Sequence, residues 1–110
     1  MTNFIHQDLA GGRWHTLTLT EQLANVGSEF ERAWSWRVKD ENSLSQNAFD
    51  RMSELLGLTI SDPRWKGLRL RELTRLRESI NEEWLSNRKN APKDLSDYFM
   101  TFAIWSRASR

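Results

Sequence analysis

Residues 62–87 constrain the fold more than any other stretch, because their apolar positions recur with the period of an α-helix. The apolar positions of this stripe are Trp65, Leu73, Leu76, Ile80 and Trp84. They align at about 100° per residue, which predicts one long amphipathic helix with a single buried face. Asp62 followed by Pro63 is an order of residues that favours a helix start. We therefore predict that this helix is the centre of the fold and that the rest of the chain packs against it.

Three further segments show the same helical period. The first begins with a capping-box sequence, in which Thr18 and Glu21 satisfy backbone amides at the helix start. Its inner side contains Leu19, Leu23, Val26, Phe30, Ala33, Trp34 and Arg37. The second segment is predicted to start at Ser45, which is a favourable N-cap residue. The last segment is predicted to begin near Asp94.

Four amphipathic helices joined by short loops predict an all-α fold, an antiparallel up-and-down four-helix bundle. A three-helix core with the first helix packed separately is the competing arrangement. Residues 1–17 lack a helical period and contain a pair of glycines, which predicts an irregular N-terminal arm. The expected apolar anchors of this arm are Phe4, Ile5, Leu9 and Trp14. Residues 18–110 then form one domain, of a size that a single core can support.

The sequence contains no recognisable signature of catalysis, of a cofactor or of a metal site. Cysteine is absent, which excludes disulfides and thiolate chemistry. His6 and His15 are the only histidines, and neither has further ligands at the spacing that a metal site needs. The glycine pair Gly11-Gly12 is not followed by the lysine of a phosphate loop. We therefore predict a protein that is not an enzyme and that has neither cofactor nor metal.

The two ends of the chain bear on its location. The N-terminus carries His6, Gln7 and Asp8, where a signal peptide would need an apolar run. The uncharged stretch 98–106 is far shorter than the roughly 20 residues of a membrane span. We expect a soluble cytoplasmic protein with no membrane partner.

Charge is distributed unevenly along the chain. Residues 64–89 contain eight Lys or Arg and four Asp or Glu, a net charge of +4, whereas the remainder carries −3. Opposite charges on packed neighbouring helices would explain this asymmetry, and so would a basic surface for an acidic partner.

A row of arginines gives the basic segment a candidate binding face. Arg64, Arg71 and Arg75 lie within about 40° of one another on the outer side of the predicted helix. Such a row suits a phosphate backbone and makes nucleic acid the alternative partner. Three glutamates are placed to pair with these arginines: Glu72, Glu78 and Glu82. If the arginines and glutamates pair, this side is instead a solvent-exposed face with salt bridges.

Arg69 interrupts the apolar stripe, since counting in fours from Trp65 reaches position 69. A buried arginine is costly unless it is paired. Either Arg69 forms a salt bridge with a carboxylate of the preceding helix, with Asp50 and Glu54 as candidates, or its side chain reaches past the end of the bundle; we predict the first, a structural ion pair. A role in binding a ligand or a phosphate is the alternative.

The last helix is apolar on two sides. Leu95, Phe99 and Phe102 account for its core stripe. Met100 and Ile104 lie about 40° apart on the opposite side and form a small apolar strip. Either the N-terminal arm covers this strip or a second copy of the helix packs on it, and we predict the second arrangement, a homodimer.

Several short phrases occur in a fixed order along the chain. They are Phe49-Asp50-Arg51, Glu54-Leu55-Leu56, Asp62-Pro63-Arg64-Trp65, Arg71-Glu72-Leu73-Thr74-Arg75-Leu76-Arg77-Glu78, Tyr98-Phe99 and Phe102-Ala103. With these phrases the chain resembles, over roughly residues 19–107, a group of small bacterial all-helical proteins with no assigned activity. The resemblance implies a compact helical fold and a bacterial origin, and it implies no site residue.

These observations favour a non-enzymatic accessory or adaptor protein that acts through protein–protein binding, with homodimer formation as one mode. The alternative is a nucleic-acid-binding accessory protein that uses the basic face of the third helix.

Overall fold

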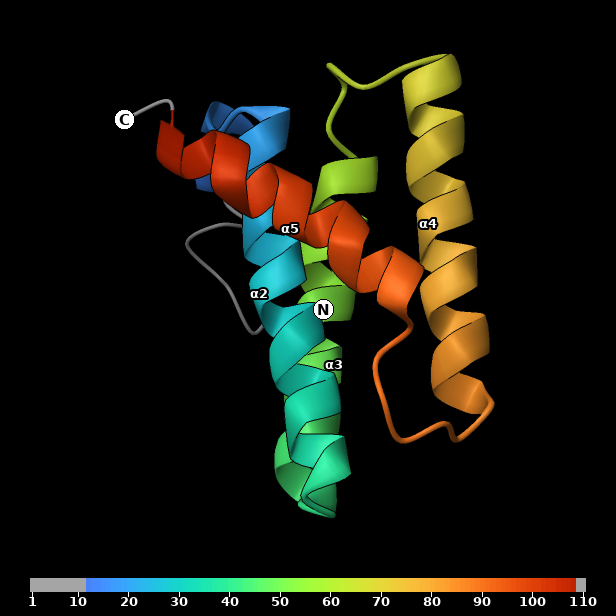
Figure 1. Ribbon diagram of the computed structural model, residues 1–110. Coiled ribbons are helices and arrows are strands. Elements are labelled where there is room, and N and C mark those ends of the chain that lie inside the picture. Colours follow the sequence, from blue (N-terminus) through green and yellow to red (C-terminus); the bar gives the residue numbers. More distant parts are fainter. Residues whose placement is uncertain (1–11, 109–110) are drawn as a thin grey trace.

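The computed structural model describes residues 12–108, which form four α-helices and one short 3-10 helix (Figure 1). The elements are η1 (Arg13–Thr16), α2 (Leu19–Val38), α3 (Asn42–Ile60), α4 (Leu68–Leu85) and α5 (Lys93–Ala108). No strand occurs within this range. Consecutive helices alternate in direction, and α5 crosses α2 obliquely (Figure 1). The predicted all-α fold of four antiparallel helices is confirmed.

Helix α2 is the element against which the others are arranged. It packs along α3 and is crossed by α5, whereas the backbone of α4 comes close mainly to α3 (Figure 1). The prediction that residues 62–87 form the central helix is therefore wrong. The reason lies in α2 itself, where Gly27 is buried and allows the backbone of α5 to approach closely at Phe99.

Large aromatic rings join α4 to its neighbours and hold its backbone at a distance. The ring of Trp84 stacks on Phe49 of α3 with centroids 4.2 Å apart, and it meets Trp34 of α2 edge-on at 4.9 Å. Arg37 of α2 places its guanidinium 3.6 Å from the centre of the Trp84 ring. The same guanidinium donates to the carbonyl oxygen of Trp84 at 3.1 Å, which satisfies an acceptor at the end of α4.

Of two predicted helix starts, one is confirmed and the other is wrong. The capping box is confirmed: Thr18 Oγ1 accepts from the Glu21 amide at 3.1 Å, and Glu21 Oε1 accepts from the Thr18 amide at 2.9 Å. The prediction of Ser45 as an N-cap is wrong, because α3 already begins at Asn42. Ser45 is buried inside the helix and donates its hydroxyl to the carbonyl oxygen of Ala33 at 2.9 Å. The hydroxyl thus links α3 to α2.

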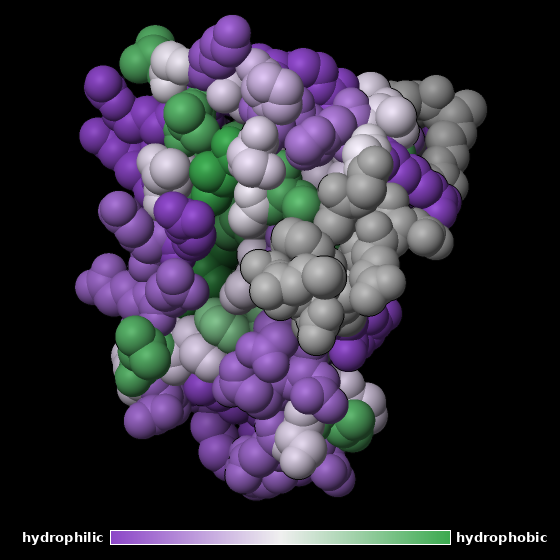
Figure 2. Space-filling view, turned by 180° about the vertical axis from the view of Figure 1, so that it is seen from behind, coloured by the Kyte–Doolittle hydropathy of each residue, from purple (hydrophilic) through white to green (hydrophobic). Residues whose placement is uncertain are grey.

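The core confirms the predicted stripe within α4, where Leu73, Leu76 and Ile80 are buried. The prediction that Trp65 belongs to the same helix is wrong, because Trp65 lies in the loop before α4 and is only partly buried. The other buried hydrophobic residues are Trp14, Leu23, Val26, Phe30, Ala33, Trp34, Ala48, Met52, Leu55, Leu56, Trp84, Leu95 and Phe99. On the side of the molecule away from α5, a narrow band of hydrophobic surface lies between hydrophilic side chains (Figure 2).

Only the end of the predicted N-terminal arm lies in the described range. Trp14, one of its predicted anchors, is buried in η1 against the core. The other predicted anchors, Phe4, Ile5 and Leu9, and the histidine His6 lie outside the described residues.

Candidate functional site

The outer side of α5 carries the predicted apolar strip. Met100 and Ile104 are each 52% exposed, whereas Leu95 and Phe99 on the other side of the same helix are buried. Trp105 follows directly and is also more than half exposed. The described residues therefore leave the strip open, and a cover by residues 1–11 falls outside what the structure describes.

A groove runs between α2 and α5 beside this strip. It has a volume of about 300 Å³ and is lined by Ala24, Gly27, Ser28, Glu31, Arg32, Phe99, Met100 and Ala103. Half of these eight residues are small, and the two helices approach closely at Gly27. One edge is apolar at Met100 and the other carries the opposite charges of Glu31 and Arg32. The groove is thus a surface that a helix side chain of another molecule can enter.

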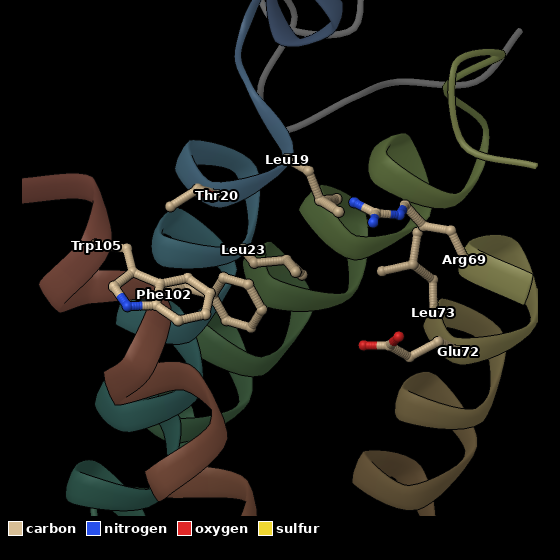
Figure 3. A pocket seen from close by; sticks show the side chains of 8 residues that line it. All are labelled: Leu19, Thr20, Leu23, Arg69, Glu72, Leu73, Phe102 and Trp105. Carbon is tan, nitrogen blue, oxygen red and sulfur yellow. The ribbon is translucent and has the colours of Figure 1, made fainter. Parts of the chain in front are cut away.

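A second hollow lies where α2, α4 and α5 meet, and we call it the three-helix cleft (Figure 3). It has a volume of about 240 Å³ and is lined by Leu19, Thr20, Leu23, Arg69, Glu72, Leu73, Phe102 and Trp105. Figure 3 shows the rings of Phe102 and Trp105 on the α5 side and the side chains of Arg69 and Glu72 reaching into the gap from α4. The buried side chains of Leu23 and Leu73 make its floor apolar.

Arg69 belongs to this cleft and not to the core. Its side chain is exposed, and within residues 12–108 it forms no salt bridge. The predicted structural ion pair of Arg69 with Asp50 or Glu54 is therefore wrong. Counting from Trp65 does not hold, because Trp65 lies in the loop before α4. Arg69 is in the first turn of α4, and its exposed side chain reaches into the cleft toward Leu19 and not into the core (Figure 3).

Glu72 takes its hydrogen bond from α5. Tyr98 donates its hydroxyl to Glu72 Oε1 at 3.0 Å. Burial of the phenol, together with this carboxylate, raises the pKa of Tyr98 well above its ordinary value, so that the hydroxyl keeps its proton at neutral pH. Arg69 and Glu72 lie one turn apart on α4 and do not pair with each other.

Arg64 does not belong to the predicted row of arginines. It lies before α4, which begins only at Leu68, and its guanidinium binds the carboxylate of Asp62 at 2.7 Å and the carbonyl oxygen of Leu17 at 2.6 Å. The prediction of one helical face with Arg64, Arg71 and Arg75 is therefore wrong for Arg64. Its charge is paired with the buried carboxylate of Asp62.

Arg71 and Arg75 do share the outer face of α4, and both are exposed. In the part of the chain that the structure describes, neither forms a salt bridge. The expected pairing of these arginines with Glu72, Glu78 and Glu82 is not formed. The outer face of α4 therefore carries two arginines without a salt bridge, with the exposed Glu78 on the same side of the helix.

A buried polar network connects η1, α2 and the loop before α4, and its centre is the side chain of Gln22. The amide of Gln22 donates to Asp62 Oδ2 and to the carbonyl oxygen of Trp14, both at 3.0 Å. Its Oε1 accepts from the indole of Trp65 at 2.8 Å. The indole of Trp14 donates to Thr59 Oγ1 at 3.0 Å. All of these groups have partners, so the network holds the fold together and offers no open binding group.

Sequence reasoning missed Gln22, although a signal was present. Gln22 lies three residues after Leu19 and four before Val26, which places a polar amide on the apolar stripe of α2. Arg69 also interrupts an apolar stripe, but its side chain is long enough to leave the core. The shorter amide of Gln22 cannot reach solvent and needs buried partners.

No metal or membrane site emerges from the described residues. His15 Nε2 lies 3.2 Å from the carbonyl oxygen of Leu58 and so connects η1 to the end of α3. Within residues 12–108 no group of three or more His, Cys, Asp or Glu is arranged to hold a metal ion. None of the four helices there is both long and apolar enough to cross a membrane.

No family model, no curated protein and no solved structure matches this chain.

Proposed function

We propose that this protein acts by binding another protein through the outer side of α5, and that the partner is a second copy of the chain. The observation that carries the proposal is the exposure of Met100 and Ile104 on a helix whose other side places Leu95 and Phe99 in the core. Apolar side chains that are grouped on one helix face gain free energy when a partner removes them from water.

The groove beside the strip supports a symmetric arrangement. In a two-fold dimer each contact occurs twice, so the strip of one copy can meet the groove of the other. The small residues Ala24, Ser28 and Ala103 leave room for a side chain as large as methionine. Glu31 and Arg32 lie at the groove edge, and Arg32 is already paired with Glu29 of its own chain at 2.6 Å.

Light scattering on purified protein tests this proposal. The parent is expected to have twice the mass of one chain, and Met100→Glu with Ile104→Lys is expected to give a folded monomer, because two charges would have to be buried at the contact. Ser43→Glu with Asn47→Lys makes the same change at exposed positions of α3 and is the matched control, expected to remain dimeric.

Two results would argue against the dimer. A parent that is monomeric at high concentration contradicts it directly. A double variant at positions 100 and 104 that fails to fold, with an intact control, would place the strip in the core of one chain.

A second candidate function is nucleic-acid binding, and the specific observation in its favour is the unpaired charge of Arg71 and Arg75. If both contact phosphates, Arg71→Gln with Arg75→Gln should weaken binding for all sequences. It should also flatten the log–log salt dependence by nearly two units for duplex DNA. Arg13→Gln with Lys39→Gln removes the same charge elsewhere and should change the slope little. A parent that shows no binding at low salt would end this hypothesis.

A further inference from the structure

Five residues of α5 recur at the spacing of a coiled-coil seam. They are Lys93, Asp97, Met100, Ile104 and Arg107, which follow one another at intervals of four, three, four and three residues. Residues at this spacing lie along one side of a helix, with a drift of only about 20° for every seven residues. All five are exposed. The apolar strip is therefore the middle of a longer seam, and both ends of this seam carry charge.

The charges at the two ends of the seam have different partners. Asp97 accepts from Lys93 at 2.6 Å, in a pair whose side chains are 64% and 88% exposed. Such an exposed pair is weak, and a carboxylate can accept from a second cation as well. At the other end, Arg107 lies beside α2, where it lines a hollow with Ala24 and Ser28. Arg107 forms no salt bridge among residues 12–108.

Asp97 and Arg107 cannot pair within one copy of the chain. Ten residues separate them on a continuous helix, which is about 15 Å along its axis. A pair between these two side chains therefore requires a second copy of α5.

A second copy of α5 can lie along the seam in two directions. If the two helices are parallel and in register, Arg107 of one copy faces Arg107 of the other, and the seam offers no carboxylate at that end. If they are antiparallel and centred on position 102, Met100 lies opposite Ile104. The same register places Asp97 opposite Arg107, and symmetry repeats both contacts. Because like charges opposite each other at an interface cost free energy, the charge pattern favours the antiparallel direction.

We propose that two copies of the chain pack α5 against α5 in antiparallel directions, centred on position 102, with Asp97 of each copy paired with Arg107 of the other. This inference rests on the proposed function, because it needs a second copy on the Met100 and Ile104 strip. It adds the direction and the register of that contact, and it gives Asp97 and Arg107 a role in choosing them.

Charge reversal tests the direction, with the dimer dissociation constant measured by sedimentation equilibrium at physiological salt. Asp97→Arg places an arginine opposite Arg107, and Arg107→Asp places an aspartate opposite Asp97. Each change alone is expected to raise the dissociation constant at least about tenfold. The variant with both changes has opposite charges facing each other again and is expected to return to within about threefold of the parent.

A parallel dimer predicts a different result for the same variants. Each residue of a parallel pair faces its own counterpart, so like charges face each other in the parent, in both single variants and in the double variant. Neither single change would then weaken the dimer. Both changes also oppose the helix dipole, and the double variant combines these two costs to α5. Recovery of the dimer in the double variant can therefore come only from the contact between copies.

Asp94→Arg is the matched control. Asp94 is also exposed and also lies near the start of α5, but it is about 120° round the helix from Met100. Its reversal is expected to change the dissociation constant less than about twofold, because it lies off the seam. Circular dichroism is expected to show the same helix content in this variant and in Asp97→Arg.

Three results would overturn the inference. They are single variants that dimerise like the parent, a double variant as weak as the single ones, and an equal effect of Asp94→Arg and Asp97→Arg. Each of these leaves a dimeric parent and therefore leaves the proposed function in place. A parent that is monomeric at every concentration would instead overturn the proposed function, and this inference with it.

Discussion

Replacing Gly27 by alanine will lower the free energy of unfolding by about 2–3 kcal/mol, the range expected when a well-packed contact is overfilled. A Cβ atom at position 27 would lie 2.7 Å from Cβ and 2.9 Å from Cγ of Phe99. These atoms sit close to the backbone of α5 and cannot rotate away, so the two helices must separate. The loss is measured by urea unfolding followed by circular dichroism.

Gly57→Ala is the control for this prediction, because Gly57 also lies inside a helix and nothing lies within 4 Å of a Cβ placed there. It should raise stability by about 0.5–1 kcal/mol through the higher helix propensity of alanine. If Gly27→Ala were as stable as Gly57→Ala, the close crossing of α2 and α5 would be wrong, and with it the shape of the groove beside Met100.

Asp62→Asn will lower the free energy of unfolding by roughly 3 kcal/mol at neutral pH, because it removes a buried charge on which several donors converge. The side chain of Asp62 is only 1% exposed and accepts from Arg64 and Gln22. An asparagine would point its own N–H groups at one of these donors. Asp40→Asn is the surface control, since Asp40 and its partner Lys89 are both exposed, and it should cost less than about 1 kcal/mol.

The carboxylate of Asp62 also makes the free energy of unfolding depend on pH. Hydrogen bonds from Arg64, with a further one from Gln22, hold the pKa of Asp62 far below its ordinary value. The stabilisation is therefore complete above the unfolded-state pKa, about 4, and it is lost as the pH falls below that value. The parent should lose stability between about pH 4 and pH 2, and Asp62→Asn should show a smaller loss over this window. Parallel pH profiles of the two proteins would contradict the assignment of the network.

Local signals predicted the parts of this fold in which each residue acts within its own helix. Thr18 and Glu21 cap the helix that contains them, and the stripe of Leu73, Leu76 and Ile80 is buried as its period requires. These features depend on residues three or four apart, so they can be predicted from the sequence alone.

The errors arise where a residue serves a distant part of the chain. Asp62 looks like a helix cap before Pro63, yet its carboxylate is used by Arg64 and by Gln22, which is 40 residues earlier, so α4 starts later. Ser45 looks like a cap as well, yet it hydrogen-bonds to Ala33. A long-range partner replaces the local role of Ser45, whereas Asp62 keeps its local partner Arg64 and gains the distant Gln22. No periodicity reveals the distant partners.

Of the two candidate surfaces, the strip on α5 was predicted from the sequence and the three-helix cleft was not. Exposure of Met100 and Ile104 follows from helical phase alone and is confirmed. The three-helix cleft was not predicted, because its walls come from three helices whose packing in space the helical period does not determine.

Pulsed electron paramagnetic resonance on a spin-labelled chain tests the central claim, the two-fold contact through α5, most directly. The chain has no cysteine, so Thr101→Cys places one label on the exposed surface beside Met100 without removing an apolar side chain. The proposed dimer predicts a short distance between the labels of two copies, and a longer one when the label is moved to Ser53 on α3. Absence of any intermolecular distance at position 101, or a shorter distance at position 53, would contradict the claim.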